Sequence, residues 1–417
     1  MAIPLPGAAN LGFMSTCSGA APTPRDGIVI AGGGLAGQRC AESLRRGGYE
    51  RAIRIVCSEP RRPYDRPPLS KELLADPACD DRLPYRPGCW YEEQSVDLLL
   101  GVSAAALDPG THRLTLSDGA KLRYERLLIC TGSRPRTLPL LAGYPNVSVL
   151  RTVDDARELR EVLGDRPRLA VIGAGFIGLE IAATARRLGA DVTIVEAAAF
   201  PLSGVLGRRL GSWFTELHRS EGVDVRTGVT VDRVSSNGAI RDLWLSDGSA
   251  VAVDHVLVGA GVQPDVAWLA DSGLDASRGV PVGVDGRTAI EDVFAAGDAA
   301  ATFDPTLGRY VPGSHWEAAA RQGARVGRTM LGLHPGPTPV SSFWTDQYGL
   351  RIQYVGDARL GESIEFDGDP NGRDFSAIFI RDGRAVAALL VDRPRALPAT
   401  RELIEKGRRN GLPGTNR

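Results

Sequence analysis

Two glycine-rich segments have a spacing that suits the binding of a dinucleotide. The first fits the pattern G-x-G-x-x-G with Gly32, Gly34, Leu35, Ala36 and Gly37, and the second repeats it with Gly173, Gly175, Phe176, Ile177 and Gly178. Glycines in such a turn let backbone N–H groups at a helix N-terminus approach a pyrophosphate. A single copy is weak evidence because glycine-rich turns are common, but two copies predict two nucleotide sites.

An acidic residue follows each glycine segment at a distance typical of ribose contact. Glu59 lies 22 residues past Gly37, and Glu196 lies 18 residues past Gly178. A carboxylate accepts hydrogen bonds from ribose hydroxyls and repels a 2′-phosphate, which an arginine would attract. Residues 197–200 (AAAF) contain no basic side chain. The second site therefore favours NADH over NADPH.

The elements that must position these residues repeat in the same order. The first unit is predicted as a strand, a helix and a strand over residues 27–31, 35–46 and 52–56. The second unit is predicted over residues 169–172, 176–188 and 191–195. This βαβ unit, used twice at such a separation, indicates two separate nucleotide domains. Further strands that end at glycines are expected at residues 127–132, 255–261 and 293–298.

The sequence pattern changes after Pro335. A helix is expected at residues 317–331, before a Pro-rich linker at residues 334–340. Alternating hydrophobic stretches then predict an antiparallel sheet at residues 351–355, 376–380 and 385–391, with a helix at 399–408. The fold class is α/β, with two Rossmann-like dinucleotide-binding domains and a C-terminal α+β domain. We expect a flexible extension at 1–24, a discontinuous FAD-binding domain at 25–137 and 263–333, an NAD-binding domain at 138–262 and the C-terminal domain at 334–417.

Composition limits the class of protein further. A chain of 417 residues has room for about three domains. The net charge of −1 gives no sign of a nucleic-acid or membrane-surface partner. The first 24 residues carry no Lys or Arg, which argues against a secretory signal, and the longest apolar run, 169–185, contains Glu180 and is not a membrane span.

The six cysteines form no Cys-x-x-Cys pair, although Cys79 and Cys89 remain open as a distant pair. Scattered free thiols suit a reducing cytoplasm. The sequence shows no metal-ligand cluster, so no metal site is predicted.

Two nucleotide sites with different surroundings suggest one tightly held FAD and one exchangeable nicotinamide cofactor. Gly297 and Asp298 support the FAD half, because a carboxylate at a strand exit can hold a ribityl hydroxyl. The alternative for Asp298 alone is a helix N-cap. Ala260 and Gly261, at another glycine exit, are assigned to the NAD site.

Four segments carry a resemblance to a known family: residues 63–71 (PYDRPPLSK), 175–180 (GFIGLE), 296–298 (AGD) and 343–348 (FWTDQY). Together they resemble the FAD-dependent ferredoxin and rubredoxin reductases that serve bacterial oxygenases and haem-thiolate monooxygenases, within the wider glutathione-reductase-like flavoproteins. Apoptosis-inducing factor and monodehydroascorbate reductase are similar relatives. The resemblance runs from about Asp26 to the C-terminus.

This resemblance implies roles for individual residues. Lys71 is expected close to flavin N5 with Glu180 as its partner, and Trp316 beside the isoalloxazine. Ala104 is expected to offer backbone contacts to the adenine, and the C-terminal domain to flank the flavin. The remaining expected FAD-site residues are Arg66, Thr131, Gly132 and Arg134.

The residues themselves also indicate the central pair. Lys71 is one of only three lysines, and Glu180 lies in an otherwise apolar helix start where a carboxylate needs a partner. At about 4 Å and an effective dielectric of about 20, such a pair gains roughly 4 kcal/mol of Coulomb energy before desolvation is subtracted. The alternative is a structural salt bridge with no kinetic effect. His315 is interpreted as packing or polar lining.

The sequence departs from the family pattern in two places. The N-terminal extension has no counterpart, and the basic residue that many members carry after the acidic end of the NAD motif is absent from residues 197–200. Weaker NADH binding is one expected consequence, unless Arg208 or Arg209 takes the place of that basic residue.

The resulting hypothesis is hydride transfer from NADH to FAD, followed by single-electron transfer to an acidic ferredoxin-type iron–sulfur protein that feeds an oxygenase or haem monooxygenase. Arg61, Arg62, Arg393 and Arg395 are candidates for a basic docking rim. One alternative is an NADH-dependent flavoenzyme with a small acceptor such as oxygen, a quinone or a radical. The other is an NADH-sensing flavoprotein. The oligomeric state is left as monomer or homodimer.

Overall fold

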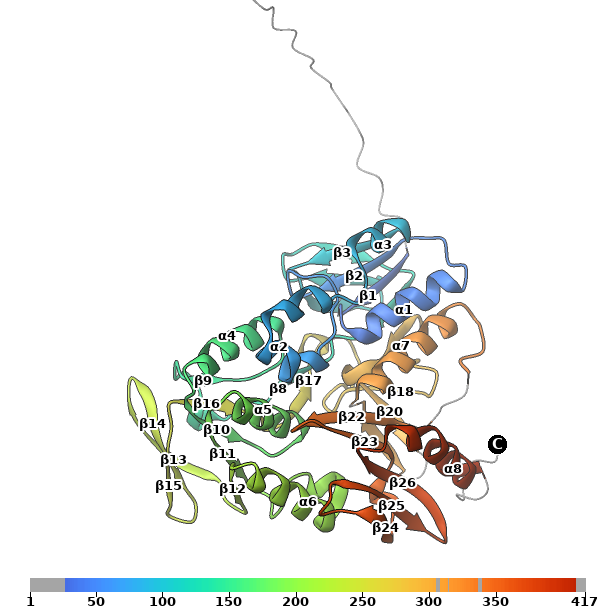
Figure 1. Ribbon diagram of the computed structural model, residues 1–417. Coiled ribbons are helices and arrows are strands. Elements are labelled where there is room, and N and C mark those ends of the chain that lie inside the picture. Colours follow the sequence, from blue (N-terminus) through green and yellow to red (C-terminus); the bar gives the residue numbers. More distant parts are fainter. Residues whose placement is uncertain (1–26, 305–307, 314, 337–339, 410–417) are drawn as a thin grey trace, which may run out of the picture.

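The computed structural model describes residues 27–304, 308–313, 315–336 and 340–409. The predicted flexible extension and Cys17 lie outside these residues. Within them the chain forms two five-stranded parallel sheets, one five-stranded antiparallel sheet and several small sheets, with helices packed against them (Figure 1).

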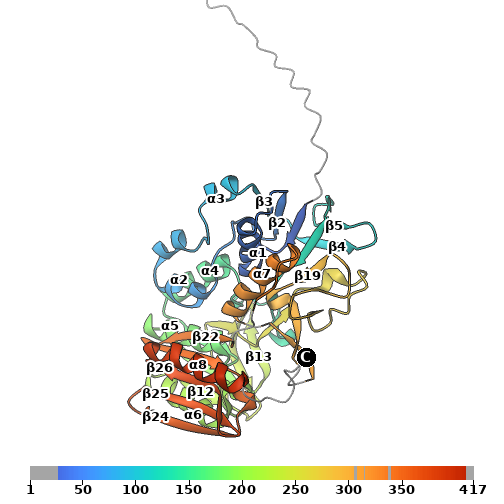
Figure 2. The same cartoon turned by 90° about the vertical axis from the view of Figure 1, so that its right-hand side faces the viewer.

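The first nucleotide sheet is entirely parallel and has the strand order β19-β7-β1-β2-β3. Its strands are β1 (Ile28–Ala31), β2 (Ile53–Cys57), β3 (Val96–Leu100), β7 (Arg126–Ile129) and β19 (Val293–Ala295). Helices α1 (Leu35–Arg46) and α7 (Trp316–Met330) lie side by side on this sheet in both views (Figures 1 and 2). Because β19 and α7 follow the second unit in the chain, a segment distant in sequence completes this sheet.

The second nucleotide sheet is also parallel, with the order β12-β11-β10-β16-β9. Its strands are β9 (Val147–Ser148), β10 (Arg168–Ile172), β11 (Asp191–Glu196), β12 (Asp224–Thr227) and β16 (His255–Val258). The helices of this unit are α4 (Val153–Gly164), α5 (Phe176–Arg187) and α6 (Ser203–Ser220). The two predicted βαβ units are confirmed, with ends that differ by at most one residue.

The C-terminal sheet is antiparallel, with the order β22-β23-β26-β25-β24. Its strands are β22 (Ser342–Gln347), β23 (Leu350–Gly356), β24 (Ser363–Asp369), β25 (Asp374–Arg381) and β26 (Arg384–Val391), followed by helix α8 (Leu397–Arg409). The prediction located three of these strands and the helix. The edge strand β22 was recognised only as a family motif.

Small sheets and short helices fill the connections. The small sheets are β4 (Ala104–Asp108) with β5 (Arg113–Leu116) and β6 (Lys121–Arg123); β13 (Val231–Asn237) with β14 (Ala239–Leu245) and β15 (Ala250–Ala252); β18 (Val280–Val282) with β20 (Ala300–Asp304) and β21 (Arg309–Pro312); and β8 (Ser133–Pro135) with β17 (Val262–Pro264). Between β2 and β3 the chain leaves the first sheet through η1 (Pro67–Ser70), α2 (Glu72–Ala75), η2 (Pro77–Arg82) and α3 (Gly88–Glu93). In this excursion α2 contacts α4, and η1 contacts α5.

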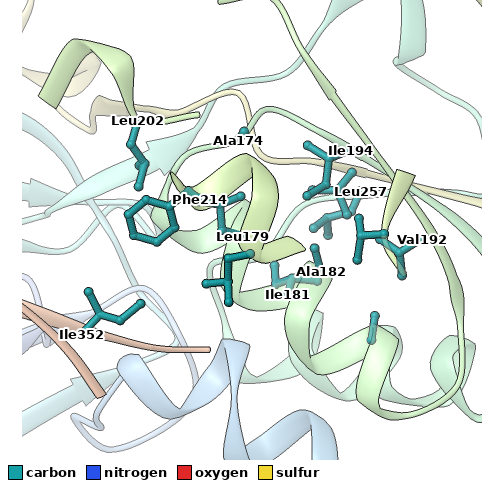
Figure 3. Close-up of a cluster of buried hydrophobic side chains, with 14 of the residues drawn as sticks. Ala174, Leu179, Ile181, Ala182, Val192, Ile194, Leu202, Phe214, Leu257 and Ile352 are labelled. Carbon is teal, nitrogen blue, oxygen red and sulfur yellow. The ribbon is translucent and has the colours of Figure 1, made fainter. Parts of the chain in front are cut away.

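One buried cluster joins the second nucleotide unit to the C-terminal sheet. Leu179 of α5 and Phe214 of α6 are fully buried in it, and Ile352 of β23 approaches them from the C-terminal sheet (Figure 3). Leu73 of α2 belongs to the same cluster. Because one apolar core includes residues from three parts of the chain, burial of that surface holds those parts in a fixed relation.

None of the helices in the described part of the chain is both long and apolar enough to cross a membrane. The apolar run at 169–185 is divided between β10 and α5, and so belongs to the folded core.

Candidate functional site

The first glycine turn has the geometry that its spacing predicts. Gly32 has a φ of 129°, and a Cβ added there would lie 2.1 Å from the carbonyl oxygen of Cys130. A Cβ on Gly37 would lie 2.2 Å from the carbonyl oxygen of Gly32, so this glycine lets α1 approach β1 closely. Beside Gly34, by contrast, no atom lies within 4 Å of the added Cβ. Protein atoms therefore fill the space beside Gly32 and Gly37, whereas the space beside Gly34 is free of protein atoms.

The second glycine turn repeats this arrangement. Gly173 has a φ of 105° and packs against Gly259, and a Cβ on Gly178 would lie 2.2 Å from the carbonyl oxygen of Gly173. Gly175 again has open space beside it. Open space at the middle glycine, in front of a helix N-terminus, is what close approach of a pyrophosphate requires. Both turns fit a bound dinucleotide.

The two acidic residues that follow the glycine turns, Glu59 and Glu196, have different partners. Glu59 pairs with Arg66 at 2.7 Å and accepts a hydrogen bond from the Tyr64 hydroxyl. Glu196 accepts backbone hydrogen bonds from Ala174 at 2.6 Å and Ala198 at 2.7 Å. Glu59 and Arg66, both expected at the FAD site, thus lie together, and Glu196 links the second glycine turn to the end of β11.

Asp298 lies in the short helix η5 (Gly297–Ala299) directly after β19. Its Oδ2 accepts a hydrogen bond from Ser133 at 2.7 Å and lies 3.5 Å from the guanidinium of Arg151. The residue that precedes η5 in the N-cap position is Ala296, so the alternative of Asp298 as an N-cap is wrong.

Sequence reasoning missed Arg151. It stands just before the capping box of Thr152 and Asp155, which starts α4 and is the only local signal at this place. Besides approaching Asp298, Arg151 accepts a hydrogen bond from Arg66 at its carbonyl oxygen, and its guanidinium lies near Gly132. The arginine therefore joins predicted FAD-site residues that come from three separate segments.

Lys71 and Glu180 form a buried ion pair. The Lys71 Nζ lies 3.0 Å from Glu180 Oε1, and the two residues are 9% and 6% exposed. Lys71 stands between η1 and α2, whereas Glu180 lies on α5 of the second unit. The pair thus spans the contact between the two nucleotide units. Loss of one partner would leave an uncompensated buried charge, which typically costs about 3–5 kcal/mol.

Glu180 has two further hydrogen-bond donors. The Ser70 hydroxyl donates to Oε2, and the Thr345 hydroxyl donates to Oε1 at 2.6 Å. A buried carboxylate with three donors has most of its lone pairs satisfied, which offsets part of the cost of removing it from water. Thr345 belongs to β22, so the C-terminal sheet contributes directly to this pair.

Aromatic side chains gather around β22, the strand that carries Thr345. Phe343 of β22 stacks on His315 with ring centroids 4.1 Å apart and meets the edge of Phe176 at 4.6 Å. Trp316 contacts Trp344 at 5.4 Å and donates its indole N–H to Asp65 at 2.6 Å. These side chains form an aromatic wall, which joins the start of α7, the second glycine turn and the C-terminal sheet.

His315 is part of this wall. Burial lowers the pKa of His315 to about 4, so its imidazole is neutral near pH 7. A neutral, stacked imidazole fits the interpretation of this residue as packing or polar lining.

The remaining predicted residues lie around the two turns. Leu35 and Ala36 are buried in the first turn of α1, and the Thr131 hydroxyl donates to the Asp265 carbonyl at 2.6 Å. Gly132 has a φ of 77°, and Arg134 is exposed on β8. Ala104 begins β4, Ile177 is exposed on α5, and Ala260 and Gly261 follow β16.

The described cysteines are all free thiols, so Cys79 and Cys89 form no disulfide. Burial raises the pKa of Cys57 to about 12 and also raises those of Cys40 and Cys130. Such thiols stay protonated near neutral pH and are poor nucleophiles.

Two glycine turns on two parallel sheets, with a buried ion pair between them, define an oxidoreductase with two dinucleotide-binding domains. The profile of the pyridine nucleotide-disulphide oxidoreductases matches residues 26–323, and a reductase C-terminal profile matches residues 342–412. The chain belongs to the pyridine nucleotide-disulphide oxidoreductase family, and membership implies FAD and either NADH or NADPH as its cofactors.

Individual relatives resemble nearly the whole chain. The ferredoxin–NAD(+) reductase component of the anthranilate 1,2-dioxygenase system of Burkholderia cepacia is 37% identical over 388 residues, which cover 92% of this chain and 95% of that protein. Putidaredoxin reductase CamA of Pseudomonas putida is 33% identical over 386 residues, covering 91% and 92%. Among solved structures, the covalent putidaredoxin reductase–putidaredoxin complex matches with a TM-score of 0.88 at 32% identity, covering 92% of this chain and 94% of that one.

Proposed function

We propose that this chain oxidises NADH and passes electrons singly to an acidic ferredoxin-type iron–sulfur protein, which in turn feeds an oxygenase or a haem monooxygenase. The observation that carries the proposal is the buried Lys71–Glu180 pair between the two nucleotide units. The names of the relatives, which include reductase components of dioxygenase systems and putidaredoxin reductase, support the same acceptor class.

FAD, when bound, accepts two electrons as a hydride and releases them one at a time. The residues proposed to hold it are those of the first glycine turn with Glu59, Arg66, Arg151 and Asp298. Lys71 supplies a fixed positive charge. Glu180 weakens the electric field of that charge at a distance and fixes the position of the ammonium group. Lys71 and Glu180 are buried, which limits the access of water to the pair.

The second site is proposed to prefer NADH. Glu196 is a fixed carboxylate, and the next residues are Ala197, Ala198 and Ala199, so a 2′-phosphate would meet negative charge without a basic partner. Arg208 lies over the ring of Phe200, four residues past Glu196, at 5.6 Å and is the stronger candidate to replace the missing basic residue. Arg209 instead lies over Phe366 of the C-terminal sheet at 4.4 Å.

We expect kcat/KM for NADH to exceed that for NADPH by about tenfold or more, which corresponds to about 1.4 kcal/mol. Stopped-flow reduction of the FAD-loaded protein by each nucleotide measures this preference. Arg208→Ala should reduce the residual rate with NADPH if that arginine receives the phosphate. Equal efficiency with both nucleotides would contradict the preference.

The docking rim of four arginines is partly neutralised. Arg61 pairs with Asp154 at 2.6 Å, and Arg393 pairs with Asp367 and with Asp374. Neighbouring carboxylates offset the charge of these two, which leaves Arg62 and Arg395 as the stronger candidates for contact with an acidic partner.

Electrostatic docking predicts a specific salt dependence. Turnover with ferredoxin should fall about tenfold between about 20 mM and about 300 mM salt, because screening weakens steering. Turnover with ferricyanide, which needs no protein docking, should change less than about twofold. Equal responses in both assays would contradict docking through charge. Rapid turnover with oxygen or a quinone, and none with a panel of ferredoxins, would instead indicate a small acceptor.

A further inference from the structure

A chain of buried hydrogen bonds runs from Glu180 into the C-terminal sheet and on to α6. Thr345 donates to Glu180, and Gln347, two residues along β22, contacts the same threonine oxygen with its Nε2 at 3.1 Å. The Oε1 of Gln347 lies 3.0 Å from the Nε2 of His218, and the other ring nitrogen of His218 lies 2.8 Å from the Tyr348 hydroxyl.

The burial of this chain excludes water as a substitute partner. Thr345 and Gln347 are each 1% exposed, and His218 is 0% exposed. Thr345 and Gln347 share one face of β22 because side chains two residues apart point the same way. The face opposite carries Trp344 and Asp346, which contact Arg351. The face with Thr345 and Gln347 thus turns toward the ion pair. β22 lies beside α5, the helix that carries Glu180 (Figure 1).

The direction of every hydrogen bond in the chain follows from Glu180. The carboxylate can only accept, so the single hydrogen of the Thr345 hydroxyl is used on it. The threonine oxygen must then accept from Gln347, which fixes the orientation of the amide and turns its Oε1 to His218. His218 must therefore carry its proton on Nε2 and accept from Tyr348 on Nδ1. All donors point toward Glu180.

We propose that Thr345, Gln347 and His218 form a positioning relay, which holds the Glu180 carboxylate in the one orientation that faces Lys71. The proposal rests on the proposed role of the Lys71–Glu180 pair. In a low-dielectric interior, aligned hydrogen bonds polarise one another and strengthen the last bond to the charged acceptor. These residues act through Glu180 and have no proposed contact with either cofactor.

The electrostatic surroundings of His218 agree with a neutral ring. Burial lowers the pKa of His218 to about 4, although the hydrogen bond with Gln347 and the charge of Glu221 favour the protonated form. On its other side the ring faces the Tyr348 hydroxyl, whose own surroundings include Glu221, Arg186 and Arg373. Protonation of Nδ1 would remove the acceptor for Tyr348, so the relay requires the neutral ring.

A first experiment measures the tautomer directly. The FAD-loaded protein, with ¹⁵N-labelled histidines, is examined by NMR from about pH 8 to about pH 5.5, and the His218→Gln spectrum assigns the signal. We expect His218 to remain neutral and protonated on Nε2 over this range. A ring protonated on Nδ1, or one that titrates near its ordinary pKa of about 6.5, would overturn the relay.

A second experiment measures the effect on the ion pair. Thr345→Val removes the bond to Glu180 with little change in volume, and should slow flavin reduction at saturating NADH about tenfold with unchanged NADH affinity. Thr345→Ser should restore the rate to within about twofold, because serine keeps the donor. Thr215→Val is the matched control, since the hydroxyl of this buried threonine on α6 donates to the Gly211 carbonyl of its own helix. A rate for Thr345→Val equal to that of the control would overturn the proposal.

These measurements use no iron–sulfur acceptor, so they are independent of the proposed electron acceptor. If Thr345→Val does not fold, Gln347→Met tests the next bond, with an expected loss of about threefold. A normal rate in that variant would also overturn the relay. If Lys71→Met slows reduction but the relay variants do not, the relay alone is wrong. If Lys71→Met has no effect on the rate of flavin reduction, the proposed role of the Lys71–Glu180 pair is itself wrong.

Discussion

Replacement of Lys71 by methionine is expected to slow flavin reduction at saturating NADH about a hundredfold while FAD stays bound. Removal of one preorganised electrostatic group from a buried site typically costs about 10²–10³ in rate, and Lys71 Nζ is held by Glu180 in a buried site. Methionine retains most of the apolar stem, so packing changes little. The measurement is stopped-flow absorbance of the flavin, with FAD content determined on the same samples.

The chain offers a matched control for this variant. Lys121 is exposed on β6, and Lys121→Met makes the same chemical change without touching the ion pair. Because Lys71→Met leaves Glu180 as a buried charge, the double variant Lys71→Met/Glu180→Gln separates lost stability from lost rate. Unchanged reduction in Lys71→Met would assign the pair a purely structural role. A loss equal in Lys121→Met would point to a nonspecific effect.

Replacement of Gly34 by alanine is expected to weaken FAD binding about a hundredfold without unfolding the apoprotein. Gly34 has a φ of −79° and a ψ of −174°, which alanine adopts without strain, and no protein atom lies within 4 Å of the added Cβ. Only a bound pyrophosphate would meet that methyl group. A hundredfold change corresponds to about 2.7 kcal/mol and is measured by FAD release on dilution.

Two further glycines complete this test. Gly175→Ala has the same open surroundings at the second turn, with a φ of −76°, and should weaken NADH binding about tenfold while FAD stays bound. Gly37→Ala is the contrasting variant, since its Cβ would lie 2.2 Å from the carbonyl oxygen of Gly32 and should destabilise the fold itself. Thermal unfolding of the apoproteins separates the two classes. Normal FAD affinity in Gly34→Ala would show that the pyrophosphate does not approach this turn.

The fold was largely predictable because its signals are local. Each glycine turn is defined by six consecutive residues, and the βαβ units around them differ from the prediction by at most one residue at their ends. Several short strands were not predicted. Among them are β8 and β17, which pair with each other. Such strands of three residues carry no hydrophobic period long enough to recognise.

The candidate site was predictable only in part. Lys71 and Glu180 were identified from a rare lysine, an acid in an apolar helix and the family resemblance, and the structure places them 3.0 Å apart. Arg151 was missed because its only local signal is the capping box that follows it. His218 was missed because a single histidine in an amphipathic helix carries no period or spacing that distinguishes it from other buried residues.

By itself the sequence determined what short-range rules govern: the two glycine turns, the acidic residues that follow them, the strand–helix–strand order of each βαβ unit, and the absence of a Cys-x-x-Cys pair. Only the tertiary structure decided which side chains meet. Glu180, His218 and Thr345 come from α5, α6 and β22, and their contacts depend on how apolar faces far apart in the chain pack together. A strand pattern with a period of two residues defines two faces, but the face that meets Glu180 is set by the shared core around Leu179, Phe214 and Ile352.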